Sequence, residues 1–309
     1  MIHLVSGGAG LIGSFLIDDL LKENNNKVIC IDNFSTGCKS NISRWVNNDR
    51  FKLIEHDVIK PIDLKVDRIW HFACPASPHR YKIDPIKTSQ INFLGTFNML
   101  ELAKKYDARI LMASSSEIYG DPKVHPQPEN YFGFVNPISE RSCYVEGKRF
   151  SESLCFDYFR THSTDIRIVR IFNTYGPRMM AKDGRVICNF IYQALNDKAL
   201  YIYGSGHQTR SFCFVEDLII GLKKIMNSNY TLPINLGSQE ELSIIDLANL
   251  IRKKINNKLK IIHTKELKED PLNRKPDIKL AQKLFNWDPK TTISNGLDRT
   301  INYFLNNKA

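Results

Sequence analysis

The segment Tyr144-Val145-Glu146-Gly147-Lys148 places a phenol and an amine four residues apart, so the two share one face if the segment is helical. A phenol ionises near pH ~10 in water and is a poor base at neutral pH. A neighbouring ammonium, together with the cationic ring of a bound cofactor, would favour the phenolate and lower the pKa of Tyr144. Tyr144 could then take a proton from a hydroxyl. The same spacing occurs in ordinary surface helices, so its meaning depends on the rest of the chain.

Three glycines, at positions 7, 10 and 13, lie between a predicted strand over residues 2–6 and a predicted helix over residues 11–21. Gly7 permits a tight turn, Gly10 lets the backbone approach a pyrophosphate, and Gly13 permits close packing of the helix on the sheet. The first turn of the helix then offers free N–H groups to the phosphates. The motif predicts a dinucleotide site, which also includes Leu11 and Ile12.

Asp32 ends the second predicted strand, nineteen residues after Gly13. A carboxylate there accepts hydrogen bonds from both ribose hydroxyls and repels a 2′-phosphate, and Asn33 follows where an arginine would bind that phosphate. The sequence therefore favours NAD over NADP. Asp57, just beyond the third strand, could contact the adenine or could be a solvated turn residue. The other residues assigned to the cofactor are Ser35, Thr36, Gly37 and Val58.

Serines follow the fifth predicted strand, in the run Ala113-Ser114-Ser115-Ser116-Glu117. Ligands of open α/β sheets bind at the carboxyl ends of the strands. Ser115 and Ser116 could be turn residues, but with Tyr144 and Lys148 they complete a Ser–Tyr–Lys set. The serine hydroxyl would hydrogen-bond the reacting oxygen, Tyr144 would move its proton, and Lys148 would hold the nicotinamide ribose.

The first half of the chain alternates strands and helices in the way that builds a parallel sheet covered on both faces. The predicted strands span residues 2–6, 27–31, 51–55, 68–73, 109–113 and 165–171, and the helices 11–21, 85–106 and 139–159. Right-handed crossovers then give an α/β, doubly wound (Rossmann) fold. We assign residues 1–172 to an NAD-binding Rossmann domain.

The strand–helix alternation changes after about residue 172. Helices are predicted over residues 186–195, 215–226, 243–254 and 294–304, the last with Ser294 as its N-cap, and strands over residues 200–203 and 258–263. We assign residues 173–309 mainly to a smaller C-terminal substrate-binding lobe, with some segments returning to the Rossmann sheet.

The composition is that of a globular protein: 42% of the 309 residues are hydrophobic and 25% are charged. No apolar run reaches the ~18 residues that span a bilayer, and the N-terminus has no signal-peptide pattern. The seven cysteines include no Cys-x-x-Cys pair, so we expect reduced thiols, the cytoplasm and no metal site. The net charge of +10 permits nucleic-acid binding or steering of an anionic small substrate. In the absence of any nucleic-acid motif, we expect the latter.

With these features the chain resembles the extended short-chain dehydrogenase/reductase superfamily and, more narrowly, the UDP-glucuronate decarboxylases, also called UDP-xylose synthases. The resemblance covers nearly the whole chain. The stretches over residues 71–78 and 274–278 separate this branch from most relatives, whereas the glycine motif does not. Further matching stretches are 6–13, 85–88, 116–122, 144–149, 170–179, 183–186, 203–206 and 208–212.

The resemblance implies a redox-neutral cycle. NAD⁺ takes hydride from C4 of UDP-glucuronate while Tyr144 takes the hydroxyl proton. The new ketone is β to the carboxylate, so CO₂ can leave with its electrons delocalised into an enolate. Protonation at C5 and return of the hydride give UDP-xylose and NAD⁺, which stays bound. The resemblance further implies a homodimer built through the helices over residues 85–106 and 139–159.

Active-site roles for Glu117 and Arg274 also follow from the resemblance. Arg274 could neutralise the β-keto acid or enolate oxygen, or it could grip the diphosphate. Glu117 could position the sugar or a proton-donating water, or it could cap the turn after the strand. The other residues assigned to the substrate are Ser77, Tyr81, Asn173, Arg178, Asn189, Tyr203, Gln208 and Arg210.

Three alternatives stay open at this point. A sugar-nucleotide 4,6-dehydratase needs an acid beside the glutamate, and position 116 is serine instead. A 4-epimerase needs no such acid, and only Glu117 and the Pro-Ala-Ser-Pro stretch at 75–78 weigh against it. A non-catalytic dinucleotide-binding protein is disfavoured by the complete Ser–Tyr–Lys set.

Overall fold

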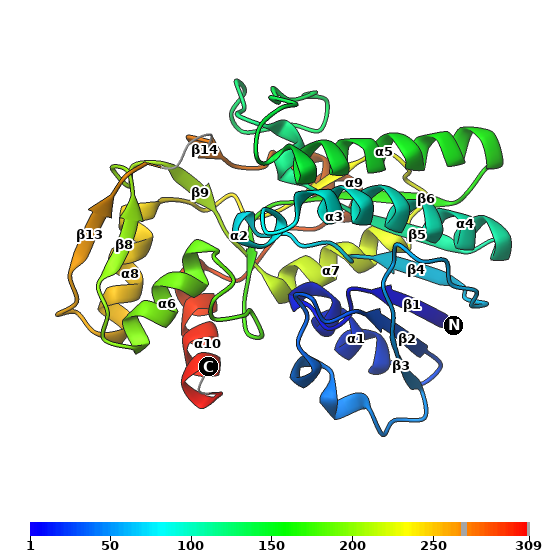
Figure 1. Cartoon of the computed structure of the whole chain (residues 1–309), viewed down its shortest axis with the longest axis horizontal. Coiled ribbons are helices and arrows are strands. Elements are labelled where there is room, and N and C mark those ends of the chain that lie inside the picture. The colour runs from blue at the N-terminus through cyan, green and yellow to red at the C-terminus, as the bar shows by residue number, and fades with distance from the viewer. Residues whose placement is uncertain (267–270, 308–309) are drawn as a thin grey trace.

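The computed structural model describes residues 1–266 and 271–307, and its centre is a seven-stranded sheet (Figure 1). The strand order is β11-β6-β5-β4-β1-β2-β3, and every pairing is parallel. The strands are β1 (Ile2–Ser6), β2 (Lys27–Asp32), β3 (Phe51–Glu55), β4 (Arg68–His71), β5 (Arg109–Ser115), β6 (Ile166–Ile171) and β11 (Ile234–Leu236). The order reverses between β1 and β4, where doubly wound sheets bind their ligands. The predicted Rossmann fold is confirmed.

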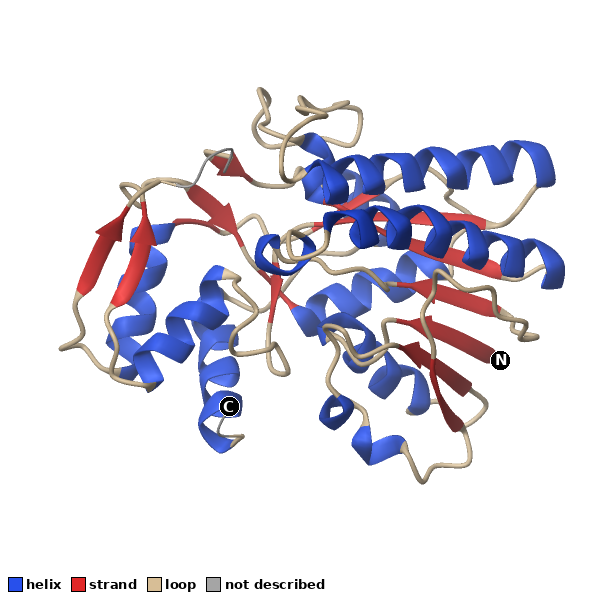
Figure 2. Cartoon of the chain, viewed as in Figure 1, coloured by secondary structure: helices blue, strands red, loops and turns tan. Residues whose placement is uncertain are grey.

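Helices cover both faces of this sheet (Figure 2). One face carries α3 (Pro85–Gln90), α4 (Thr96–Tyr106) and α5 (Ser142–His162), and the other carries α1 (Leu11–Leu21) and α7 (Val215–Met226). Side chains of a strand alternate between the faces. In β5, Ile110 and Met112 are buried among residues of α4 and α5, whereas Leu111 is buried among those of α1 and α7. Each strand is therefore apolar on both sides, which explains its continuous apolar run in the sequence.

The predicted helix over residues 85–106 is interrupted. Between α3 and α4 the stretch Ile91–Gly95 is π-helical. At this point Asn92 lies against Gly147 of α5, where an added Cβ would be 2.7 Å from the Asn92 amide nitrogen. The helix that carries Tyr144 and Lys148 is thus packed closely on its neighbour, and apolar periodicity alone does not reveal the inserted residue.

The second half of the chain adds a smaller lobe, whereas β11 joins the large sheet and α7 and α9 (Lys279–Phe285) pack beside it. The helices of the smaller lobe are α6 (Val186–Leu195), α8 (Ile244–Ile255) and α10 (Ile293–Asn306). Its strands form three small sheets: β7 (Thr174–Tyr175) with β10 (Cys213–Phe214), β8 (Leu200–Tyr203) with β13 (Ile261–Thr264), and β9 (Thr209–Ser211) between β12 (Glu241–Ser243) and β14 (Asn273–Arg274). Among the described residues, no helix has the length and apolar character to cross a bilayer.

Two predicted helix starts are wrong. The last helix is capped by Thr292, whose hydroxyl accepts the Asn295 N–H at 3.3 Å, and Ser294 lies inside its first turn. The helix predicted from residue 139 begins at Ser142, because the Ser139 hydroxyl accepts the Arg141 N–H at 3.1 Å and forms a preceding turn. Residue propensities locate the first residue of a helix only to within a few positions, and the hydrogen bonds of the capping side chains determine it.

Candidate active site

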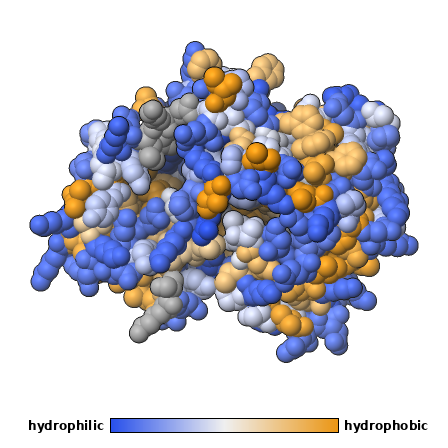
Figure 3. All heavy atoms as spheres, viewed as in Figure 1, coloured by the Kyte–Doolittle hydropathy of each residue, from blue (hydrophilic) through white to orange (hydrophobic). Residues whose placement is uncertain are grey.

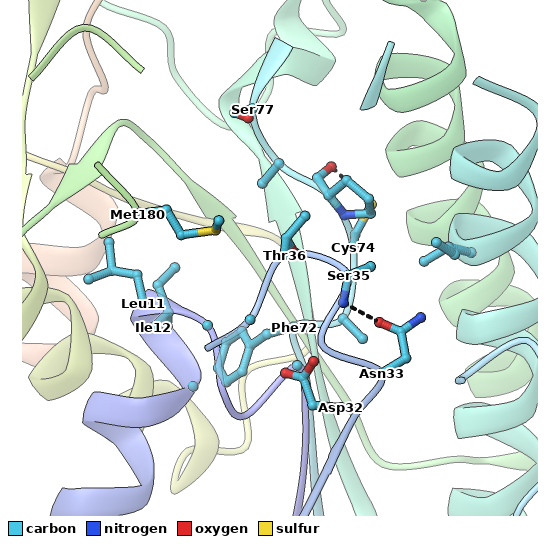
Figure 4. Close-up of a pocket in the computed structure, with 18 of the residues that line it drawn as sticks. Leu11, Ile12, Asp32, Asn33, Ser35, Thr36, Phe72, Cys74, Ser77 and Met180 are labelled. Carbon is cyan, nitrogen blue, oxygen red and sulfur yellow. Dashed lines mark hydrogen bonds between the residues drawn. The ribbon is translucent and has the colours of Figure 1, made fainter. Parts of the chain in front are cut away.

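A first cavity lies at the carboxyl ends of β1 and β2 (Figure 4). Every residue assigned to the cofactor by the glycine and aspartate motifs lines it: Gly7, Gly10, Leu11, Ile12, Gly13, Asp32, Asn33, Ser35, Thr36, Gly37, Asp57 and Val58. Phe72 and Cys74, which follow β4, complete the wall near these residues. The two βα connections and the end of β4 therefore meet at one site.

The glycines leave room that no other residue could leave. Gly7 has a φ of 71°, and a Cβ there would lie 2.8 Å from the backbone nitrogen of Ala73. A Cβ at Gly13 would collide with the carbonyl oxygen of Gly7. The loop can therefore fold tightly enough for α1 to present its first N–H groups to the cavity.

Asp32 ties this loop to the end of β2. Its carboxylate accepts the N–H of Ala9 at 2.9 Å and that of Phe34 at 2.8 Å. Burial raises the pKa of Asp32, and the two N–H donors oppose that rise. A carboxylate has further lone pairs for two ribose hydroxyls. Beside it, the Asn33 side chain accepts the Ser35 N–H at 3.1 Å (Figure 4).

The residues of this cavity fit an NAD molecule. The glycine loop offers backbone donors, Asp32 offers an acceptor, and the buried Ser77 hydroxyl has no hydrogen-bond partner in the described part of the chain. Asp57 faces the cavity and forms an ion pair with Lys87 at 2.8 Å. Burial opposes ionisation of Asp57, but this lysine and nearby donors outweigh it and lower the pKa of the carboxyl. Asp57 thus lines the cavity as an ion-paired carboxylate, and its contact with the adenine stays a prediction.

A second cavity of about 320 Å³ lies at the carboxyl ends of β5 and β6. Its lining contains all the residues predicted to be catalytic, Ser115, Ser116, Glu117, Tyr144, Lys148 and Arg274, and five predicted substrate contacts, Asn173, Asn189, Tyr203, Gln208 and Arg210. Ile12, Phe72 and Cys74 line both cavities. The two sites therefore adjoin, which a hydride transfer between cofactor and substrate requires.

Tyr144 and Lys148 are both buried on the inner face of α5. The Lys148 ammonium donates to the carbonyl of Ala113 at 2.9 Å and lies 5.9 Å from the Tyr144 ring centroid. Burial raises the pKa of Tyr144, and a hydrogen bond with the Ser115 hydroxyl opposes the rise. Burial also lowers the pKa of Lys148. The protein alone thus does not give the low phenol pKa expected from the pair, and the serine is the side chain that favours the phenolate.

Glu117 lies between two guanidinium groups at the end of β5. Arg141 donates to one carboxylate oxygen at 2.6 Å, and Arg274 donates to the other. Burial would favour the protonated acid, but Arg274 and Arg141 outweigh it and lower the pKa of Glu117 to about 2. Glu117 is therefore a carboxylate at neutral pH, and its role in the reaction stays a prediction.

A buried network fixes the turn that carries Glu117. The Ser114 hydroxyl donates to Glu152 of α5 at 2.5 Å, and Arg170 of β6 pairs with the same carboxylate at 2.8 Å. Arg170 also donates to the hydroxyl of Tyr119 at 3.0 Å. Tyr119 ends the 3₁₀ turn Ser116–Tyr119, so β5, β6 and α5 hold this turn together.

Three residues assigned to the substrate lie outside the second cavity. Ser77 and Arg178 line the first cavity instead. Arg178 pairs with Asp18 of α1 at 2.6 Å, and its guanidinium stacks 4.3 Å above the Phe15 ring, so its side chain is held on the cofactor side. Tyr81 lines neither cavity, and its ring stacks on that of Tyr144 at 5.0 Å and 4°. Tyr81 is the last residue of α2 (Pro78–Tyr81).

Two arginines of the site escaped the sequence reasoning. Arg141 lines the second cavity, and Arg185 lines both and pairs with Asp183. Burial disfavours the charged form of Arg185, but Asp183 outweighs it and raises the pKa of the guanidinium. Arg185 belongs to a stretch that carried the family resemblance, whereas the pairing of Arg141 with Glu117 depends on the fold.

Comparisons with known proteins agree with this geometry. The sequence profile of the GDP-mannose 4,6 dehydratase family matches residues 4–300. The chain is 52% identical to UDP-glucuronic acid decarboxylase 3 of Arabidopsis thaliana over 294 residues, which cover 95% of this chain and 86% of the relative. It is 49% identical to UDP-glucuronic acid decarboxylase 1 of Xenopus tropicalis, over 97% and 71% of the two chains.

Among solved structures, the chain is similar to the UDP-glucuronic acid 4-epimerase of Bacillus cereus in complex with UDP-glucuronic acid and NAD. The TM-score is 0.90, the identity is 28%, and the match covers 99% of each chain. An epimerase of Methanothermobacter thermautotrophicus gives a TM-score of 0.91 at 28% identity, over 99% of this chain and 93% of the other.

Proposed function

Because the chain belongs to the GDP-mannose 4,6 dehydratase family of the extended short-chain dehydrogenase/reductase superfamily, and within it to the UDP-glucuronic acid decarboxylases, we propose that it converts UDP-glucuronate to UDP-xylose and CO₂ with NAD as a bound, recycled cofactor. The observation that carries the proposal is the 52% identity to such a decarboxylase along 95% of the chain. The two adjoining cavities, one suited to NAD and one to a nucleotide sugar, agree with it.

The oxidation and reduction at C4 rest on Ser115, Tyr144 and Lys148. The glycine loop and Asp32 would hold NAD, which would supply a hydride acceptor and donor beside C4. Ser115, already hydrogen-bonded to Tyr144, orients the C4 oxygen. Tyr144 accepts the C4 hydroxyl proton on oxidation and gives it back on reduction. The Lys148 ammonium, 5.9 Å from the ring centroid of Tyr144, would hold the nicotinamide ribose.

Decarboxylation requires charge stabilisation at the other end of the cavity. Loss of CO₂ leaves an electron pair that the C4 ketone takes up as an enolate. The guanidinium of Arg274, buried and fixed on Glu117, provides a preorganised positive group for the developing negative charge. Its Nε–H group has no hydrogen-bond partner among the described residues and could donate to an oxygen of the substrate. Because Glu117 is ionised, the proton added at C5 comes from a water that the carboxylate orients.

The nucleotide end of the substrate would bind in the C-terminal lobe. Arg274 of β14 and Arg210 of β9 are direct neighbours in paired strands. We assign the diphosphate to Arg210, because a guanidinium fork matches phosphate oxygens, and leave Arg274 to the charge that develops at C4. Tyr203, at the end of β8 and half exposed, is free to bracket the uracil. We propose that Asn173, Asn189 and Gln208 are polar contacts of the substrate. We also propose that residues 173–309 form most of the substrate-binding lobe.

The direct test is to incubate the purified protein with UDP-glucuronate and measure CO₂ and the nucleotide sugars formed. We expect one CO₂ for each UDP-xylose, no net consumption of NAD, and at least about 100-fold slower formation of both products by Tyr144→Phe. UDP-galacturonate without CO₂ would identify a 4-epimerase instead. Loss of water from C6 cannot occur on a C6 carboxylate, so a 4,6-dehydratase would act only on a UDP-hexose, which serves as the second substrate tested.

We also propose that the protein is a homodimer in the cytoplasm. The outer faces of α4, α5 and the π-helical stretch expose Phe93, Phe97, Phe150 and Phe159, which are 38–49% accessible. Figure 3 shows apolar atoms gathered over this region. A second copy would cover them, and all seven cysteines are free thiols, as in a reducing compartment. Phe97→Glu should dissociate the dimer in sedimentation, whereas Ile220→Glu, on α7 where the side chain is also exposed, should not.

A further inference from the structure

Arg141 connects two parts of the active site that the reaction uses at different steps. Its side chain donates to Glu117 at the end of β5, at 2.6 Å. Its carbonyl oxygen accepts the N–H of Tyr144 and of Val145, each at 3.0 Å, and so begins α5. One residue therefore fixes the carboxylate of Glu117 relative to the helix that carries Tyr144.

Without the Arg141 side chain, the Glu117 carboxylate would lose the arginine that binds one of its two oxygens. Arg274 holds only one oxygen of Glu117, and a carboxylate bound at one oxygen can rotate about its last torsion. With Arg141 bound to the second oxygen, both oxygens of Glu117 are held and the carboxylate is fixed in one orientation. Because Arg274 is paired with Glu117, its guanidinium is fixed through the same carboxylate.

The charges around Glu117 come from three elements. Arg141 and Tyr144 face it from α5, Arg274 from β14, and Tyr81 from α2. The arginines favour the ionised acid, burial disfavours it, and the two tyrosines are neutral at neutral pH because burial raises their pKa values. Removing one guanidinium therefore lets burial raise the pKa of Glu117.

We propose, resting on the decarboxylase function above, that Arg141 is a positioning residue for decarboxylation: it holds the Glu117 carboxylate in one orientation, so that Glu117 aims both Arg274 and the C5-protonating water. The oxidation at C4 depends on Ser115, Tyr144 and Lys148 and needs only the backbone of Arg141. Loss of the side chain should therefore slow the steps after oxidation and spare the first hydride transfer.

The test compares Arg141→Met and Arg141→Lys with the wild type at UDP-glucuronate saturation. A misplaced catalytic group costs about 100-fold in rate, so we expect kcat for CO₂ release to fall by about 100-fold in Arg141→Met with KM changed little. Absorbance at 340 nm should show NADH accumulating in this variant. Arg141→Lys should recover part of the rate. Arg160→Met, an exposed position in the last turn of α5, is the matched control and should behave as wild type.

A double-mutant cycle separates positioning from general damage to the fold. If Arg141 acts through Glu117, adding Arg141→Met to Glu117→Gln should lower kcat no further than Glu117→Gln alone. Additive losses would overturn the proposal. So would unchanged kcat in Arg141→Met, or a loss explained by melting temperature or NAD content. A wild type that releases no CO₂ would instead refute the decarboxylase function.

A readout that needs no activity decides the same point. In protein labelled with ¹³C at the glutamate carboxyls, the Glu117 signal is the one absent from Glu117→Gln. We expect it to titrate at higher pH in Arg141→Met than in the wild type. An unmoved titration refutes the proposed role whatever the substrate.

Discussion

Protonation of Glu117 should destabilise the protein in acid. The folded state lowers the pKa of this carboxyl from an ordinary 4.5 to about 2. The unfolded chain therefore binds the proton more readily than the native one, and stability falls as the pH drops below 4.5 toward 2. Above pH 4.5 the full contribution is present.

The size of this contribution follows from the pKa difference. At about 1.4 kcal/mol per pKa unit, lowering the pKa from 4.5 to about 2 is worth about 3 kcal/mol in the free energy of unfolding. At pH 3.5 the unfolded carboxyl is about nine-tenths protonated and the native one is still ionised, so about 1.4 kcal/mol of it is already lost. The Glu117 side chain is only 17% exposed, so solvent screens the pairs weakly.

Urea unfolding of the wild type and of Glu117→Gln, followed by circular dichroism between pH 6 and 3.5, measures this effect. Other carboxyls titrate in both proteins, so the difference between their unfolding free energies isolates Glu117. The wild-type advantage should shrink by about 1.4 kcal/mol over this range. Glu55→Gln, which removes an ion pair exposed on the surface, is the control and should show no comparable trend. A difference that stays constant with pH would refute the assigned ionisation of Glu117.

Three further predictions concern the hydride-transfer machinery. Tyr144→Phe should retain NAD and UDP-glucuronate but lower kcat by about 10²–10⁴-fold, and turnover near wild type would remove Tyr144 from its role. Burial lowers the pKa of Lys148 below its ordinary 10.5, so kcat should decline as the pH rises through a value below 10.5 and the ammonium loses its proton. The guanidinium of Lys148→Arg keeps its charge, so the pH–rate profile of this variant should not show that decline. A Cβ at Gly13 collides with the carbonyl of Gly7, so Gly13→Ala should lower the NAD content of the purified protein and cost about 1–3 kcal/mol of stability, whereas unchanged NAD content would contradict the close approach.

The Rossmann half could be predicted from the sequence because its elements are local and strongly periodic. The strands β1 and β3 and the helix α1 span the predicted residues, since apolar runs and the glycine motif define both ends. Strands β9, β12 and β14 were not predicted. Each has only two or three residues and exists because another short segment lies beside it, which no local pattern encodes.

Some features of the site could also be predicted from the sequence, whereas others could not. The cofactor residues come from turns next to predicted strands, so their gathering in one cavity could be expected from the fold rule alone. The sequence assigns Arg178 to the substrate, yet Asp18, a residue 160 positions earlier, holds its side chain on the cofactor side. The direction of the Tyr144 pKa shift could likewise not be predicted from the sequence, because burial of the phenol depends on residues distant in the chain, such as Tyr81, whose ring stacks on it.

The choice among epimerisation, dehydration and decarboxylation has a physical basis in where charge is placed. In the proposed mechanism, Tyr144, Lys148 and Ser115 would serve any reaction that passes through a 4-ketone, so they cannot select one. Ser116 offers no acid to expel a C6 hydroxyl. A 4-epimerase must let the ketone turn over in the cavity, and any group that binds the C6 carboxylate firmly opposes that rotation. Arg274, buried and braced through Glu117, is suited to hold a carboxylate and the enolate that follows it. Glu117→Gln, which removes the partner that holds Arg274, is therefore expected to shift products from UDP-xylose toward a 4-epimer, whereas loss of Tyr144 or Lys148 is not.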